Sequence, residues 1–227
     1  MIEENIALLR DSLPADKVVL VAVTKTQPPD AVRIAFAAGL SVMGENRVQE
    51  ALEKAADLSD LPLEWHLIGH LQTNKVKQAV SLFSLIHSVD SQRLASEIDR
   101  CARNAGKVQD VLLQVNVAGE DTKTGVALEE VDELAVFIES LPNLRLCGVM
   151  TIAPLFEDAE QTRPIFRATR SIFERLGKKS AHPEAFRWLS MGMTHDYKIA
   201  VEEGANMVRI GSGIFGARIT RYKEGAL

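Results

Sequence analysis

The sequence predicts an α/β protein built as a single (β/α)8 TIM barrel with one additional helix at the N-terminus. About eight short runs rich in β-branched and other apolar residues alternate with helical patterns along the whole chain. Strands that alternate with helices in this way pair in parallel, and eight such units are the number that closes a barrel. The length of 227 residues is also enough for one barrel, although most barrels are longer.

The predicted strands are short and mostly apolar. The first, at 18–25, reads VVLVAVTK and is apolar as far as Val23, as expected of a strand that is buried on both faces. The other predicted strands follow at 40–46, 64–70, 85–90, 110–117, 144–153, 186–192 and 206–213.

The predicted helices carry recognisable start and stop signals. The segment 29–39 has a proline at its start and a glycine at its end, the usual asymmetry of helix punctuation. Ser91 is a good N-cap for the helix at 91–106. The remaining helices are predicted at 1–14, 47–58, 74–83, 128–140, 158–176 and 195–204. The competing architecture for the same order of elements is an open doubly wound sheet. The sequence contains no linker and no internal repeat, which predicts a single domain, 1–227.

The composition excludes several classes of protein. The formal net charge is -5, whereas a nucleic-acid-binding domain is expected to be basic. Only two cysteines occur, Cys101 and Cys147, which indicates free thiols in a reducing compartment. No apolar run reaches the roughly 20 residues that a membrane span requires, and the acidic N-terminus does not resemble a targeting peptide. We therefore expect a cytoplasmic protein that binds neither nucleic acid nor membrane.

The segment GSGIFG at 211–216 matches the G-x-G-x-x-G pattern of dinucleotide-binding turns. A Rossmann turn must be followed by a helix and a second strand, and residues 217–227 are too few to build them. A second interpretation is a glycine-rich connection without a ligand. The third follows from the barrel, where phosphate often binds to the loops after strands seven and eight. Those loops are SMGMT at 190–194 and GSG at 211–213, and we favour a phosphate-binding site there.

Lys25 and Arg209 are predicted to point into the mouth of the same barrel. Side chains alternate along a strand, so Val21, Val23 and Lys25 share one face, and Arg209 shares a face with Gly211. Partial desolvation there would lower the pKa of Lys25 and favour attack on an aldehyde to form a Schiff base. A lysine that only extends to solvent, and an arginine in a salt bridge, are the alternatives. A phosphate site together with a reactive lysine is the pair of anchors that pyridoxal 5′-phosphate requires. Asn46, at the end of the second strand, either donates to the phenolic oxygen of that cofactor or is a turn residue.

Eight ordered segments resemble the pyridoxal phosphate homeostasis proteins (the YggS/PROSC family) over nearly the whole chain. They are AVTKT around Lys25, GENRVQE at 44–50, EWHLIGHLQTNK at 64–75, IHSVDS at 86–91, QVNVAGEDTKTGV at 114–126, GVMTIAP at 148–154, SMGMTHD at 190–196 and VRIGSGIFGAR at 208–218. The departures from the family pattern are conservative: Thr194 stands where serine is common, Val149 where leucine is common, and Ser212 where threonine is also frequent.

The resemblance implies a barrel like the N-terminal domain of alanine racemase, the fold-type III arrangement, that binds pyridoxal 5′-phosphate (PLP). It implies that Lys25 holds PLP as a Schiff base, that Asn46 lies near the ring oxygen, and that Arg209 faces the ring nitrogen. The residues implied around the phosphate are Ser190, Met191, Gly192, Gly211 and Ser212.

The resemblance also implies a function in intracellular PLP homeostasis, without established turnover and with effects on amino-acid and keto-acid balance. Amino acids or PLP-dependent apo-enzymes are the partners to expect. The alternative is a small PLP-dependent amino-acid racemase or lyase. A racemase needs a second acid/base, which in alanine racemase comes from an added β-domain of the partner subunit. No segment for such a domain follows the predicted barrel, and we expect a monomer that does not racemise efficiently.

Overall fold

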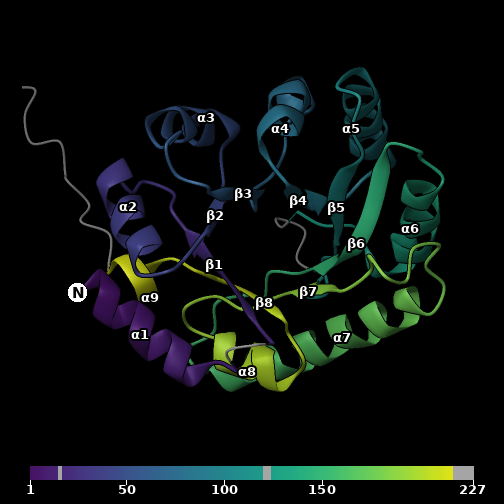
Figure 1. The fold of residues 1–227 in the computed structure, drawn as a ribbon. Coiled ribbons are helices and arrows are strands. Elements are labelled where there is room, and N and C mark those ends of the chain that lie inside the picture. Colours follow the sequence, from purple (N-terminus) through teal and green to yellow (C-terminus); the bar gives the residue numbers. More distant parts are fainter. Residues whose placement is uncertain (15–16, 120–123, 217–227) are drawn as a thin grey trace, which may run out of the picture.

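Eight parallel strands close into a barrel in chain order, and helices surround it (Figure 1). The structure is a computed structural model, and it describes residues 1–14, 17–119 and 124–216. The strands are β1 (Val19–Val23), β2 (Val42–Glu45), β3 (Glu64–Leu67), β4 (Leu85–Val89), β5 (Gln109–Gln114), β6 (Leu144–Met150), β7 (Trp188–Ser190) and β8 (Met207–Ile210). Because β1 pairs with β8 as well as with β2, the barrel prediction is confirmed and the open doubly wound sheet is excluded.

The helices lie between the strands as the sequence predicts. They are α1 (Ile2–Ser12), α2 (Pro29–Ala37), α3 (Val48–Asp57), α4 (Val76–Leu82), α5 (Gln92–Asn104), α6 (Val131–Glu139), α7 (Arg163–Gly177), α8 (Tyr197–Glu202) and α9 (Ser212–Phe215). Short 3-10 turns precede α4, α6 and α7 at Thr73–Lys75, Leu128–Glu130 and Ala159–Thr162. None of the helices in the described ranges is long and apolar enough to cross a membrane.

The N-terminal helix completes the outer ring. Helices α2 to α8 each follow one of the strands β1 to β7, and α1 lies between α8 and α2 (Figure 1). Ser12 and Tyr197 share a hydrogen bond of 2.9 Å, which links α1 to α8. Arg10 donates to the carbonyl of Gly39 at the end of α2. Asn5 donates to the carbonyl of Ile214 in α9, so the additional helix also supports the end of β8.

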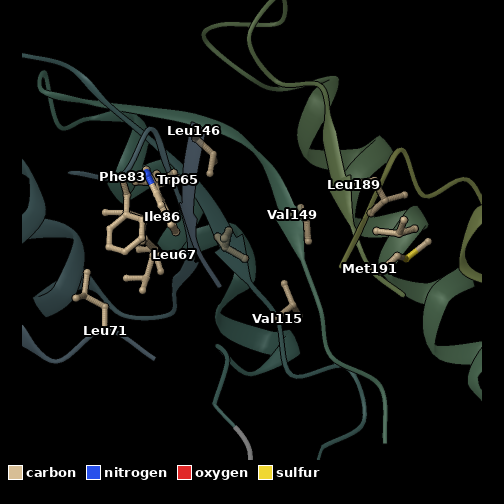
Figure 2. Packing of buried hydrophobic residues seen from close by; sticks show 14 of the residues in the cluster. Trp65, Leu67, Leu71, Phe83, Ile86, Val115, Leu146, Val149, Leu189 and Met191 are labelled. Carbon is tan, nitrogen blue, oxygen red and sulfur yellow. The ribbon is translucent and has the colours of Figure 1, made fainter. Parts of the chain in front are cut away.

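Two separate cores follow from side-chain alternation along the strands. The larger one lies between the strands and the helices, and Figure 2 shows Trp65, Leu67, Phe83 and Ile86 of this core gathered together. The smaller one fills the lower barrel interior with Val21, Leu85, Leu112, Cys147, Met150 and Met207. Barrel interiors are usually filled by such layers of apolar side chains. Here the apolar filling does not reach the top, which leaves space at the carboxyl ends of the strands.

Each of the eight observed strands ends earlier than the sequence predicts. The predicted strand 18–25 ends at Val23 because the chain turns at Thr26, whose φ is 64°. The predicted strand 186–192 ends at Ser190, and Gly192 follows with φ of 93°. The excess residues of the predicted strands are therefore loop residues at the rim of the barrel, where the candidate site lies.

Candidate functional site

A cavity of about 520 Å³ opens at the carboxyl ends of the strands. In a (β/α)8 barrel this is the end that carries active and ligand-binding sites. Residues that directly follow β1, β2, β3 and β8 contribute to it, together with the loops after β6 and β7. The lining residues are Val23, Lys25, Gln27, Asn46, Ile68, Ile152, Leu155, Met193, Thr194, His195, Arg209, Gly211, Ser212 and Gly216.

Lys25 stands on a tight turn that directly follows β1. The N–H of Gln27 donates to the carbonyl of Thr24, and between them Thr26 adopts a left-handed conformation with φ of 64°. A β-branched residue in this region is a strained outlier. Glu50 offsets the strain by accepting a hydrogen bond of 2.5 Å from the backbone N–H of Thr26. The turn that presents Lys25 is therefore held by a side chain of α3.

A buried ionic cluster lies behind this turn. Lys54 Nζ donates to the carbonyl of Thr24, to Glu45 Oε1 at 2.7 Å and to Glu50 Oε1 at 2.8 Å. Thr24 Oγ1 also donates to Glu45 Oε1, at 2.6 Å. Burial raises the pKa of Glu45, against the hydrogen bonds from Lys54 and Thr24. For Glu50, burial would raise the pKa, but hydrogen bonds from Lys54 and from the Thr26 backbone outweigh it and lower the pKa.

Asn46 borders the cavity beside Lys25, and Gly69 allows it to do so. A Cβ at Gly69 would stand 2.4 Å from the backbone oxygen of Asn46, closer than real Cβ atoms approach. The loop after β3 therefore packs directly on the backbone of Asn46, and only glycine permits this contact.

Arg209 borders the cavity from below and is almost fully buried. Its register partner in β1 is Val21, which places it deeper than Lys25. Arg209 donates to Ser190 Oγ at 2.6 Å and to the carbonyl of Thr151 at 2.8 Å. Burial lowers the pKa of Arg209 to about 10, so the guanidinium keeps its charge at neutral pH.

The turn after β8 brings Gly211 and Ser212 to the cavity. Thr194, from the loop after β7, accepts a hydrogen bond of 3.2 Å from the N–H of Gly213. A Cβ at Gly213 would lie 2.8 Å from Ile210 and 3.1 Å from Thr194. The two loops that the sequence analysis singled out are thus in direct contact.

Three residues expected near a phosphate do not line the cavity. Ser190 is fully buried, and its hydroxyl is hydrogen-bonded to Arg209 and to His87, so the structure does not bring it to the ligand space. Met191 points the other way, into the outer core, where Figure 2 shows it near Leu189. Gly192 packs on α8, and a Cβ there would lie 2.6 Å from Ala200.

The sequence did not single out Thr194 and His195 as lining residues or His87 as a buried polar residue. Thr194 lies in the loop 190–194 that the sequence indicated for phosphate, and His195 follows it directly, so their position after β7 was a usable signal. His66 and His87 lie in the short strands EWHL and LIHSV among buried apolar residues, and a histidine inside a strand was the signal that could have found them. His70, by contrast, is exposed at the rim.

A family model described as "Alanine racemase, N-terminal domain" matches residues 1–219. The pyridoxal phosphate homeostasis protein of Aquifex aeolicus is 49% identical over 199 residues, which cover 88% of this chain and 86% of the relative. The protein of the same name from Escherichia coli K12 is 37% identical over 230 residues, 96% of this chain and 97% of the relative. The chain belongs to the pyridoxal phosphate homeostasis proteins, a group with the alanine racemase N-terminal fold.

Solved structures of the family agree with this fold. PipY of Synechococcus elongatus without PLP has a TM-score of 0.89 at 41% identity, covering 95% of this chain and 100% of that protein. PipY with PLP bound has a TM-score of 0.86 at 42% identity with the same coverage. Alanine racemase of Clostridium difficile has a TM-score of 0.76 at 14% identity, covering 98% of this chain and 58% of that protein. The last comparison shows the shared barrel fold alone.

Proposed function

We propose that this chain binds PLP in the cavity at the carboxyl ends of the strands and serves in intracellular PLP homeostasis. The observation that carries the proposal is that Lys25, Arg209 and Ser212 border one cavity. The cavity of about 520 Å³ lies within the size range of small-molecule sites. A relative that is 42% identical over its whole length has been solved with PLP bound.

The lining residues fit the chemical groups of PLP. The amine of Lys25 is the group that would take up the aldehyde, with loss of one water molecule. Asn46 is an amide that can donate to the ring oxygen. Ser212 and the backbone at Gly211 border the same cavity and would hold the phosphate, and Thr194 joins them in place of Ser190. When bound, PLP supplies an aldehyde and a ring that withdraws electrons.

Arg209 supports a binding function over catalysis. We assign its guanidinium to the ring nitrogen of PLP, where it would donate a hydrogen bond. Arginine does not give up its proton in proteins, so it leaves that nitrogen unprotonated. An unprotonated ring is a weaker electron sink than one paired with a carboxylate. This supports holding and delivering PLP. The partners that we propose are amino acids or apo-enzymes, and we propose a monomer in the cytoplasm.

Reductive trapping tests the PLP site. The purified protein should be yellow, and borohydride should fix one PLP on Lys25, located by peptide mass. Lys25→Ala should lose the adduct, whereas Lys198→Ala, which removes an exposed lysine of α8, should keep it. A covalent adduct of the same yield in Lys25→Ala would refute the assignment.

The racemase or lyase alternative has its own test. His195 lines the cavity with Lys25 and offers a second group able to carry a proton. Incubation with single L-amino acids should yield no D-enantiomer or cleavage product above a Lys25→Ala blank. Turnover that disappears in both Lys25→Ala and His195→Gln would establish the alternative.

A further inference from the structure

A chain of hydrogen bonds crosses the barrel interior from the lower end of β3 to the cavity. Arg209 donates to Ser190 Oγ at 2.6 Å, and Ser190 Oγ lies 3.1 Å from His87 Nδ1. His87 Nε2 lies 3.1 Å from His66 Nδ1, and His66 Nε2 lies 3.0 Å from Glu64 Oε1. Strands β3, β4, β7 and β8 thus each contribute to one polar path through an interior that is usually apolar.

The two ends of this path are groups of fixed hydrogen-bonding character. Arg209 can only donate hydrogen bonds, and it borders the cavity. Glu64 is about half exposed at the start of β3, and its hydrogen bond with His66 lowers its pKa. An ionised carboxylate can only accept hydrogen bonds. Ser84 donates a second one to the same oxygen of Glu64, at 3.0 Å.

Fixed ends determine the position of every proton between them. His66 must donate from Nε2 to Glu64, so in a neutral ring its Nδ1 accepts from His87 Nε2. His87 then accepts at Nδ1 from the hydroxyl of Ser190, which in turn accepts from Arg209. Burial is the main cause that holds the pKa of His87 well below its usual range, and the nearby His66 and Arg209 lower it further. A low pKa agrees with a neutral ring. In this arrangement each of these polar atoms has a partner, as buried groups require.

The opposite arrangement leaves one group unsatisfied. If both nitrogens of His66 carried protons, His66 would donate to His87, and His87 Nδ1 would donate to Ser190. The serine oxygen would then accept two hydrogen bonds, from His87 and from Arg209. Its own proton would have no acceptor within this path. A buried donor without a partner is costly, so the path favours the neutral arrangement.

We infer that Glu64 is a positioning residue that acts through His66, His87 and Ser190 to fix the guanidinium of Arg209 in the cavity. The path fixes the orientation of Arg209 and does not conduct protons, because Arg209 at its upper end does not release one. The effect on a ligand rests on the proposed function, since Arg209 faces the PLP ring in that proposal. The arrangement of protons does not rest on it and can be tested without PLP.

Nitrogen NMR of the imidazole rings tests the arrangement in the full-length protein without PLP. With signals assigned through single histidine variants, His66 and His87 should both be neutral at pH 7, with the proton on Nε2. A proton on Nδ1 of either ring, or a doubly protonated ring, would overturn the inference whether or not the chain binds PLP.

Variants of Glu64 test the positioning. Glu64→Ala should remove the preference for Nε2 at His66, shift the absorption maximum of bound PLP and weaken PLP retention about three- to tenfold, as for one ordinary hydrogen bond. Glu64→Gln keeps an oxygen that can accept from His66 and should restore all three readouts. Glu53→Ala removes an exposed glutamate of α3 as a control. If the tautomers are as inferred but Glu64→Ala leaves the absorption spectrum and PLP retention unchanged, the positioning role is excluded. If the unaltered protein does not retain PLP, the proposed function is refuted instead.

Discussion

The ammonium of Lys54 donates a hydrogen bond of 2.5 Å to the backbone carbonyl of Thr24, the residue that precedes Lys25. The same ammonium binds Glu45, whose side chain is fully buried, and Glu50. Glu50 in turn accepts a hydrogen bond from the backbone N–H of Thr26, the residue after Lys25. One buried cation therefore connects two carboxylates to the segment that presents the candidate PLP lysine. The site depends on this cluster although none of its three charged residues lines the cavity.

Lys54→Met should be strongly destabilising. Removing one partner of a buried ion pair leaves an uncompensated charge and costs about 3–5 kcal/mol. Burial already raises the pKa of Glu45, so its carboxyl would take up a proton in the variant. Urea unfolding measures the loss, and Arg33→Met, which breaks an exposed pair with Asp60, should change stability little. Addition of Glu45→Leu should recover part of the loss, and a single variant as stable as the wild type would contradict the role of the cluster.

Gly69→Ala should impair the site through Asn46. The added Cβ would stand 2.4 Å from the backbone oxygen of Asn46 and 2.7 Å from its Cα, and overpacking of this kind costs about 1–3 kcal/mol. Relief of the clash moves Asn46 away from its place in the cavity, so PLP retention should fall together with stability. Gly177→Ala is the matched control, because its Cβ would meet only the ring of Phe186 at 3.2 Å. Equal retention in the two variants would show that the position of Asn46 does not matter.

Acid should destabilise the protein through His87. The pKa of His87 in the folded state lies well below 6.5. Below about pH 6.5, His87 is therefore protonated in the unfolded chain but stays neutral in the folded chain. This contribution to stability is present above pH 6.5 and is lost as the pH falls, with a limiting slope of about 1.4 kcal/mol per pH unit for one proton. Unfolding measured between pH 7 and 5 separates the effect from carboxylates that titrate below about pH 4.5.

The variant His87→Asn should flatten this dependence, because its amide can accept and donate but does not titrate. His182→Asn removes an exposed ring and should leave the dependence in place. An unchanged slope in His87→Asn would assign the acid sensitivity to other groups.

Much of the fold follows from local patterns in the sequence. Strands buried on both faces are continuous apolar runs, and side-chain alternation places Arg209 of β8 on the interior face. Lys25 lies on the turn after β1, and it also borders the cavity, as the alternation extended beyond the strand predicts. Alternation also places the side chain of Met191 on the face opposite to Ser190, in the outer core. Strand ends were less predictable, because the turn at Thr26 depends on Glu50, which lies in another helix.

The depth of a residue in the barrel could not be read from spacing along one strand. Ser190 pairs with Met207 of β8, two residues below Arg209, so its hydroxyl lies beneath the guanidinium rather than in the cavity. That offset comes from the stagger of neighbouring strands in a closed barrel, which is a property of the whole sheet. The path from Glu64 to Arg209 was hidden for the same reason, since its members come from four strands.

Binding of inorganic phosphate separates the residues that hold the phosphate from those that hold Arg209. Ser212 and Thr194 line the cavity, and loss of one charge-assisted hydrogen bond costs about 1.5–3 kcal/mol. Ser212→Ala should therefore weaken both PLP retention and competition by inorganic phosphate about 10- to 100-fold, and Thr194→Ser should keep both. Ser190→Ala should alter the absorption of bound PLP through Arg209 but leave phosphate competition unchanged. If Ser190→Ala loses phosphate competition and Ser212→Ala does not, the phosphate binds under the β7 turn and Ser190 must turn away from Arg209 when PLP enters.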